Sequence, residues 1–289
     1  MSENTNETKV IDIDVEYFLN REKEAQGALL DSKFDEALDI LKEPISKIDE
    51  FYQSEIYCPQ NVFDSAILLN YLGKEVSQKS FAKVNFFDFY LIAGSANYNM
   101  NNKEEAREYY RKAIKLNPAS SIARIFDIRI SEEINDYDDL LGKFQDALYF
   151  AYNRADMGKI YKLAGDYLVH KKDFENAMVS YHLSMIYDLN DEMADIISKV
   201  ATDNKIDLDN SDYLSEEKMK KFYDEYKIPL MPNDKLSELA LAMGDDAYNK
   251  RSYAVAKYSY KIAYDLTFDE KIKSILDEIE RKSNKVFNQ

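Results

Sequence analysis

Residues 87–120 read FDFYLIAGSANYNMNNKEEAREYYRKAIKLNPAS, and a pattern within this stretch occurs three times in the chain. Gly94, Gly165 and Gly244 each precede an alanine by twelve residues, and a tyrosine follows each alanine by four. The alanines are Ala106, Ala177 and Ala256, and the tyrosines are Tyr110, Tyr181 and Tyr260. Because the chain has only 7 glycines in 289 residues, three in one frame are not expected by chance. Small residues at this spacing indicate stacked pairs of antiparallel helices.

The three glycines have a packing explanation. A glycine inside a helix costs about 1 kcal/mol relative to alanine, so a helix keeps one only where something else compensates. We expect each glycine to let the second helix of its pair approach closely, and the alanine to do the same from the other side. Residues four apart share one face of a helix, so each alanine and its tyrosine point the same way.

The pattern resembles the tetratricopeptide repeat, in which an aromatic residue and a Leu-Gly pair precede an alanine, a second aromatic residue and a proline. The copies are residues 87–120, 158–191 and 237–270. Their matching positions are Tyr90, Ala93, Gly94, Ala106, Tyr110, Ala113 and Pro118; Tyr161, Ala164, Gly165, Ala177 and Tyr181; and Met243, Gly244, Ala256, Tyr260 and Ala263. Leu189 and Phe268 replace the proline in the weaker copies. The resemblance implies an all-α fold, a right-handed α–α superhelical solenoid of helix hairpins, and we interpret the chain as a bacterial member.

Further helix pairs are expected between these copies, because the glycines are separated by about two repeat lengths. Residues 119–157 are predicted to hold a divergent helix pair with apolar residues at helical spacing. Before the third copy we expect a second pair, with residues 214–226 as its last helix and the polar residues 203–214 as a surface insertion. Its first helix has an apolar stripe formed by Met193, Ile196, Ile197 and Val200.

An N-terminal helix pair is predicted within residues 13–53, with helices at about 14–31 and 33–53. Its basis is the similarity between KFDEA at residues 33–37 and DFENA at residues 173–177.

Two segments near the N-terminus do not follow the repeat. Residues 1–12 have too little apolar content to fold alone, and we expect a disordered tail. Residues 54–83 are irregular, with a short helix in NVFDSAILLNYLG, and we expect them to pack near the N-terminal end as an elaboration outside the repeats.

The solenoid is predicted to cover residues 84–289 and to end in a capping helix at residues 268–287. Thr267 and Glu270 have the spacing of a capping box at its start. One face is apolar, with Ile272, Ile275, Leu276 and Ile279. A solenoid needs such a helix, apolar on one side and polar on the other, to cover its last repeat.

The net charge of −16 disfavours nucleic acid and anionic membrane surfaces as partners. We therefore expect a protein or peptide partner that is basic, apolar or both. No apolar run approaches the length of a membrane span, and no signal-peptide pattern occurs, which favours a cytoplasmic protein. The single cysteine, Cys58, excludes an internal disulfide and is interpreted as a packing residue.

Motifs for catalysis, cofactors and metals are missing from the sequence. It has no glycine-rich phosphate loop, CxxC pair or GxSxG motif. His170 and His182 are interpreted as surface residues, and Glu132-Glu133 as part of a solvated helix face. Residues 207–218 resemble a calcium loop, but Asp212 and Lys218 occupy the places of the required glycine and glutamate. We expect no cofactor, no metal site and no enzymatic activity.

The resemblance implies that the first helix of each pair lines a concave groove. The free face of these helices is predicted to carry Leu91, Ser95 and Tyr98; Lys162, Asp166 and Val169; and Leu241, Asp245 and Tyr248. Some of these side chains can instead pack against neighbouring helices. Some relatives clamp a terminal carboxylate with lysine and asparagine, but here Lys162 is the one basic residue among the nine.

The function that follows is a protein- or peptide-binding scaffold. One alternative is a regulator whose solenoid closes on a signal peptide, although residues 1–60 show no basic DNA-recognition helix. A second alternative, an enzyme-associated subunit, rests on the irregular residues 54–83.

Overall fold

The computed structural model describes residues 13–51, 56–71, 81–189, 191–208 and 212–287. These residues form fourteen α-helices, and their one β-bridge joins Tyr57 and Phe81. The helices are α1 Val15–Leu30, α2 Phe34–Phe51, α3 Val62–Tyr71, α4 Phe86–Asn99, α5 Lys103–Leu116, α6 Ser121–Glu133, α7 Leu140–Phe150, α8 Arg154–His170, α9 Phe174–Tyr187, α10 Asp191–Asn204, α11 Glu216–Tyr226, α12 Asp234–Asn249, α13 Tyr253–Thr267 and α14 Glu270–Phe287. The predicted all-α fold is confirmed, and the predicted tail at residues 1–12 lies outside the described residues.

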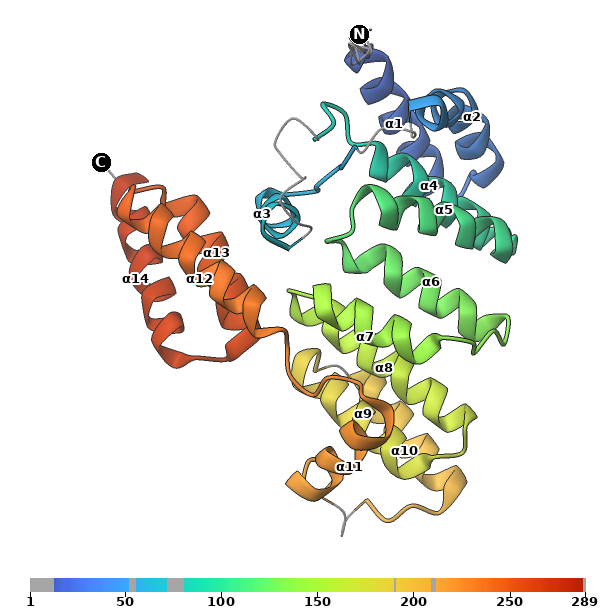
Figure 1. Cartoon of the computed structure of the whole chain (residues 1–289), viewed down its shortest axis with the longest axis vertical. Helices are drawn as coiled ribbons and strands as arrows, with labels where there is room; N and C mark the ends of the chain where they lie inside the picture. The colour runs from blue at the N-terminus through green and yellow to red at the C-terminus, as the bar shows by residue number, and fades with distance from the viewer. Residues whose placement is uncertain (1–12, 52–55, 72–80, 190, 209–211, 288–289) are drawn as a thin grey trace, which may run out of the picture.

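Most of the helices pair with their neighbours in sequence. The hairpins α1–α2, α4–α5, α6–α7 and α8–α9 form one stack, which Figure 1 shows from the blue helices down to the yellow ones. The pair α12–α13 and the helix α14 form a second group at the left of the same view. The chain is therefore a helical repeat solenoid whose C-terminal group shares an apolar core with α7, α8 and α9 of the main stack.

The three repeated glycines lie where a tyrosine ring of the partner helix packs directly on the backbone. A Cβ atom added at Gly94 would lie 2.7 Å from Cε1 of Tyr110, and one added at Gly244 would lie 2.9 Å from Cδ1 of Tyr260. The fit of Gly165 against Tyr181 is closer still. These distances are too short for any side chain, so the contact requires glycine. The spacing of the sequence pattern thus reports a direct contact within each hairpin.

The turns inside the hairpins share a residue in the left-handed backbone region. Asn101, Lys172 and Arg251 have φ values of 65°, 60° and 59°, and each lies seven residues after the repeat glycine. In α1–α2, where Ala25 takes the place of the glycine, Ser32 has a φ of 60° at the same spacing. None of the four is glycine, although glycine adopts this conformation most easily. These four residue types share no feature from which the turn could be predicted.

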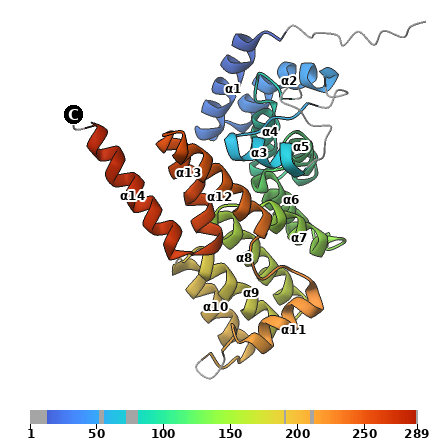
Figure 2. The same ribbon diagram turned by 60° about the vertical axis from the view of Figure 1, so that its left-hand side comes forward.

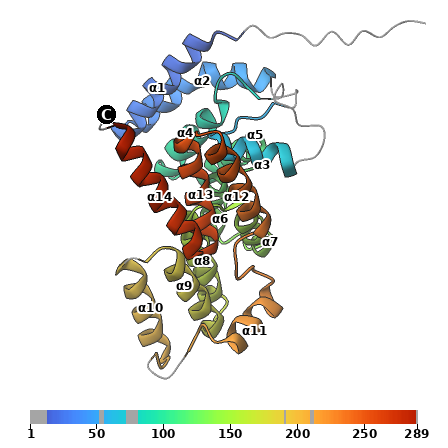
Figure 3. The same ribbon diagram turned by 90° about the vertical axis from the view of Figure 1, so that its left-hand side faces the viewer.

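Residues 191–226 differ from the expected helix pair. Helix α10 packs on α9 through Met193, Ile197 and Ala201, and α11 packs on α9 separately through Phe222. Figure 3 shows α10 and α11 on opposite sides of α9. The hydroxyl of Tyr226 donates a 2.5 Å hydrogen bond to Asp173, which fixes the end of α11 at the start of α9. The apolar stripe was predicted correctly, but its partner is α9 and not α11.

Helix α3 forms within the irregular segment, and it contacts the C-terminal group. It contacts α12, and Figure 1 shows it between the N-terminal helices and the C-terminal group. Phe63, Ile67 and Leu68 are buried in the same apolar core as residues of α12–α14. The segment therefore packs in two places: Cys58 is buried in the N-terminal core, whereas the apolar face of α3 is covered by helices distant in sequence.

A buried carboxylate, Asp64, anchors α3. It is 1% exposed and accepts hydrogen bonds from the Tyr152 hydroxyl at 2.7 Å and the Asn117 side-chain amide at 2.7 Å. The backbone N–H of Gln60 donates a third at 3.0 Å, and Asn61 donates to the Tyr152 hydroxyl at 2.7 Å. Asn117 ends α5, whereas Tyr152 lies between α7 and α8. Asp64 thus joins α3 to two levels of the stack.

Helix α14 packs on α13 with Ile272 and Ile279 buried, and Figure 2 shows it along the outer side of the C-terminal group. The predicted capping box is wrong. Thr267 is the last residue of α13, and the chain turns at Phe268, which has a φ of 53°. Asp269 caps α14 instead, because its carboxylate accepts a 2.8 Å hydrogen bond from the backbone N–H of Lys271.

Candidate binding surface

The polar residue after each repeat glycine was predicted to face a ligand, and it binds the packed tyrosine of its own hairpin. The Tyr181 hydroxyl donates to Asp166 at 2.8 Å, and the Tyr260 hydroxyl donates to Asp245 at 2.5 Å. In the first copy, Ser95 and Tyr110 are hydrogen bonded at 3.2 Å. Ser95, Asp166 and Asp245 therefore have a structural partner in each of the three repeats.

The carboxylate of Asp166 is paired with a lysine of the same helix. Lys162, one turn earlier on α8, pairs with the second carboxylate oxygen at 2.7 Å. Burial, followed by the charge of Asp166, raises the pKa of Tyr181, so the phenol stays protonated and continues to donate. Two of the predicted ligand-binding residues, Lys162 and Asp166, thus form an ion pair inside one repeat.

Tyr98 and Tyr248 each connect the first helix of a hairpin to the helix that follows the hairpin. The Tyr98 hydroxyl donates to Glu133 on α6, and Arg129 lies 5.2 Å from the centre of the Tyr98 ring. Near the C-terminus, the Tyr248 hydroxyl donates to Glu278 on α14 at 3.0 Å and accepts from Lys282 at 2.6 Å. The Lys282 ammonium group also lies 4.9 Å from the centre of the Tyr248 ring. Both tyrosines therefore use their polar groups and their ring faces within the fold.

The three apolar members of the predicted set are half-buried. Val169 and Leu241 pack against the large apolar core, and Leu91 packs against the N-terminal one. The residues on α4 and α8 belong to the main stack, whereas those on α12 lie in the C-terminal group, on the other side of α3 in Figure 1. The structure does not bring the nine predicted residues into one continuous row.

Glu132 on α6 was interpreted as solvated, and this was wrong. Its Oε1 atom is buried without a hydrogen-bond partner, and burial, followed by the charge of Asp166, raises the pKa of Glu132 to about 9. Its neighbour Glu133 is hydrogen bonded to Tyr98 and paired with Lys103 at 3.0 Å. Glu132 is thus buried without a partner, whereas Glu133 is fully paired. The Glu-Glu dipeptide alone does not predict this difference.

A cavity of about 210 Å³ opens between α1 and α4. It is lined by Glu22, Gln26, Leu29 and Leu30 of α1 and by Asp88, Leu91, Ile92 and Ser95 of α4. We call this the α1–α4 groove. It includes Leu91 and Ser95 from the predicted set, whereas the contribution of α1 was missed. That contribution could not be assigned from the repeat, because α1 lies before the first clear copy.

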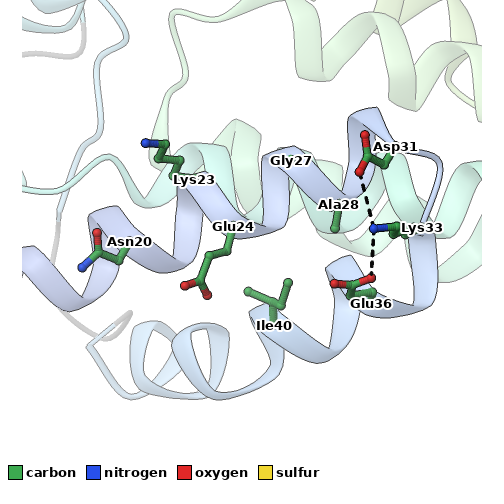
Figure 4. Close-up of a pocket in the computed structure, with 9 residues that line it drawn as sticks. All are labelled: Asn20, Lys23, Glu24, Gly27, Ala28, Asp31, Lys33, Glu36 and Ile40. Atoms are coloured by element: carbon green, nitrogen blue, oxygen red, sulfur yellow. Dashed lines mark ion pairs between the residues drawn. The ribbon is translucent and has the colours of Figure 1, made fainter.

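A second cavity, of about 700 Å³, lies between α1 and α2 and is shown in Figure 4. Lys33 lies between Asp31 and Glu36, at 3.4 and 3.8 Å. Gly27 is open to this cavity, since a Cβ atom added there would meet nothing within 4 Å. The cavity is lined by both lysine and acidic side chains, and it lies at the first hairpin of the stack. These features suit the solvated end of a solenoid more than a ligand site.

The described residues offer little for catalysis or metal binding. They contain no group of three or more His, Cys, Asp or Glu side chains that could hold a metal ion. His170 stacks on Tyr137 at 4.1 Å, and His182 stacks on Tyr213 at 5.2 Å. Burial raises the pKa of the Cys58 thiol to about 11, so it stays protonated. Part of the calcium-like segment, residues 209–211, lies outside the described residues.

Within the part of the chain that the structure describes, no helix combines the length and apolar character that crossing a membrane requires.

Comparison with known proteins agrees with the geometry of the hairpins. A sequence model of the tetratricopeptide repeat matches residues 87–120, which form α4, α5 and the turn after them. No curated protein matches the chain. The matched repeat contains the contact between Gly94 and Tyr110, and the same contact recurs in two further hairpins. Residues 87–120 are therefore a tetratricopeptide repeat, and the hairpins of Gly165 and Gly244 share its central contact.

Proposed function

We propose that this protein is a non-catalytic scaffold that binds a peptide or a segment of another protein on the inner surface of its helix stack. Tetratricopeptide repeats generally mediate protein–protein interaction, and the matched repeat includes α4. The observation that carries the proposal is the α1–α4 groove, where side chains of that repeat line an open cavity. A ligand can contact Leu91 and Ser95 there without displacing a helix.

The charge of the protein supports a basic and apolar partner. The net charge is −16, and the groove itself contains the carboxylates of Glu22 and Asp88 beside leucine and isoleucine side chains. Such a surface attracts cations and repels phosphate groups, so nucleic acid and anionic membranes are unfavourable partners. A single cysteine, Cys58, suits a reducing compartment, and we propose that the protein acts in the cytoplasm.

The other predicted residues are proposed as secondary contacts further along the inner surface. They are Tyr98, Lys162, Asp166, Val169, Leu241, Asp245 and Tyr248. Their polar groups already have partners within the fold, so a ligand would have to share those hydrogen bonds. We therefore expect most of the binding energy to come from the α1–α4 groove.

Selection from a random peptide library with the full chain as bait tests this proposal. We expect enrichment of peptides that combine lysine or arginine with apolar residues. Binding should weaken with added salt, because exposed charges are screened over about 8 Å at physiological ionic strength. A matched variant with a charge reversal outside the groove, at the exposed Glu105 of α5 (Glu105→Lys), should keep the selected peptides. Failure to enrich any peptide, or enrichment of acidic ones, would contradict the proposed function.

A further inference from the structure

One face of α1 carries exposed apolar side chains that no other described helix covers. Val15, Leu19 and Leu30 are 36%, 53% and 78% exposed. Together with Glu22 and Gln26 they are spaced by four, three, four and four residues, so all five lie on one face of the helix. The buried residues of α1, such as Phe18 and Ala25, lie on a different face. The helix is thus apolar on two sides.

The exposed face of α1 continues into the α1–α4 groove. Glu22, Gln26 and Leu30 line the groove on one side, and Asp88, Leu91 and Ser95 line it on the other. A cavity of about 210 Å³ is smaller than the sites that hold drug-sized ligands, which begin at about 300 Å³. It suits one long side chain, with Leu30 at its wall and Leu19 outside it.

The two carboxylates of the groove have no cation beside them. Among the described residues, no lysine or arginine forms an ion pair with Glu22 or Asp88, and Asp88 accepts a 2.5 Å hydrogen bond from the amide of Asn85. Elsewhere on the stack, Glu133 pairs with Lys103, and Asp166 pairs with Lys162. The groove therefore holds two carboxyl groups without a paired cation, beside leucine and isoleucine side chains.

The pKa values of Glu22 and Asp88 are consistent with two carboxyl groups that lack a cation. Burial, followed by the charge of Glu22, raises the pKa of Asp88 to about 7. Burial also raises the pKa of Glu22. Both shifts mean that the two charges are unfavourable as they stand and would be relieved by a bound cation.

We propose that the α1–α4 groove binds a partner segment in which a lysine or arginine lies between two apolar residues. The basic side chain enters the cavity between Glu22 and Asp88, and the apolar residues cover Leu19 and Leu30. This inference rests on the proposed scaffold function and names the chemistry of its partner. A bare metal ion fits less well, because the described residues supply two carboxylates and no third acidic, histidine or cysteine ligand.

The geometry of α1 sets the spacing of the partner. Leu19 and Leu30 are separated by eleven residues, or about 16 Å along a helix with a rise of 1.5 Å per residue. Glu22 lies three residues from Leu19 and eight from Leu30. A helical partner segment would thus place its basic residue about one turn from one apolar anchor and about two turns from the other.

The test compares two double variants with the parent for the peptides that the library selects. Glu22→Gln with Asp88→Asn removes both charges and keeps the shapes, and Leu19→Ser with Leu30→Ser removes the exposed apolar surface. We expect each double variant to weaken binding by at least about tenfold. We expect the same loss when the basic residue of the peptide is replaced by norleucine. The control variants Glu36→Gln, on the end cavity, and Leu189→Ser, exposed beyond α9, should bind as the parent does. Circular dichroism verifies that each variant is folded.

Three outcomes would overturn the inference. Selected peptides that bind both double variants as tightly as the parent would show that they use another surface, and the scaffold function would stand without this site. Equal binding of the lysine and norleucine peptides would remove the role of the carboxylates. Sedimentation that shows an oligomer of the parent, dissociated by Leu19→Ser with Leu30→Ser, would assign the groove to a second copy of the chain. A library that yields no peptide would contradict the scaffold function itself.

Discussion

The Tyr181 hydroxyl donates a 2.8 Å hydrogen bond to Asp166 while the Tyr181 ring packs on the neighbouring Gly165. One side chain therefore sets both the separation of α8 and α9, through its ring, and their relative rotation, through its hydroxyl. The same pair of contacts occurs between α12 and α13. Asp166 and Asp245 thus hold the hairpins together, and this limits what they can offer a ligand.

Gly165→Ala should destabilise the protein by about 1–3 kcal/mol, because the added Cβ would overlap the fixed ring of Tyr181. Gly27→Ala is the matched control, since Gly27 also lies inside a helix but has nothing within 4 Å of the added atom. There the better helix propensity of alanine should stabilise by about 0.4–1 kcal/mol. Urea denaturation measures the free energy of unfolding of both variants. Equal effects of the two substitutions would contradict the packing role of the repeat glycine.

Lys172→Gly should leave stability unchanged or raise it by up to about 1 kcal/mol. Lys172 has a φ of 60°, where a residue with a Cβ costs about 1–2 kcal/mol, and glycine removes that cost at some expense in unfolded-state entropy. The adjacent Lys171 has a φ of −72°, so Lys171→Gly should destabilise by about 0.5–1 kcal/mol. The two melting temperatures should therefore move apart. If both variants lose the same stability, the left-handed turn is not strained.

Asp127→Ala should cost about 3–5 kcal/mol. Asp127 is buried and pairs with Arg107 at 3.2 Å and with Lys143 at 2.8 Å. Arg107 would keep Asp136 at 2.6 Å, but removal of Asp127 leaves Lys143 without a carboxylate between α6 and α7. Asp246→Ala breaks the exposed pair with Lys250 and should change stability by less than about 1 kcal/mol. Chemical denaturation of both variants checks the difference. A small effect at Asp127 would mean that water reaches this network.

The stability of the parent should fall as the pH rises from about 5 to 9, and Glu132→Gln should reduce that fall. The pKa of Glu132 is raised to about 9, so the folded protein holds a proton that the unfolded chain, with a pKa of about 4.3, releases. This contribution is complete below the unfolded value and is lost as the pH rises through the folded one. The variant should therefore gain stability relative to the parent at higher pH.

Glu133→Gln is the matched control for that pH series. Burial acts to raise the pKa of Glu133, but hydrogen bonds from Tyr98 and Lys103 outweigh it and lower the pKa. Its contribution to stability is present at neutral pH and lost in acid, so this variant should show no relative gain at higher pH. Denaturation curves for Glu132→Gln that run parallel to those of the parent at every pH would show that Glu132 ionises freely.

The hairpins could be predicted from sequence because their contacts are local. The glycine, alanine and tyrosine of each repeat lie within sixteen residues of one another, so their spacing alone reports how two neighbouring helices pack. The position of α3 could not be predicted in this way, because Asp64 and Tyr152 meet across 88 residues of chain. The capping box failed for a local reason, since Asp269, one residue before α14, is also a strong helix cap.

The candidate site was only partly accessible from sequence. Leu91 and Ser95 were found from the repeat frame, but the same frame also selected Tyr98 and Tyr248, whose hydroxyls bind the next helix. A usable signal was present in α1, where apolar residues at Val15, Leu19 and Leu30 lie on a different face from Phe18. Reading both faces of each predicted helix would have identified it.

The hydrogen bonds of Asp64 also determine how this solenoid should unfold. A simple repeat array is held by contacts between neighbours, so its ends can fray while its middle stays folded. Here α3 binds Asn117 and Tyr152 and packs on α12, so one early segment depends on several later ones. Such distant contacts favour a single cooperative transition and slow folding, because the long loops must close before the contacts form. We therefore expect the chain to unfold as one cooperative unit and not repeat by repeat.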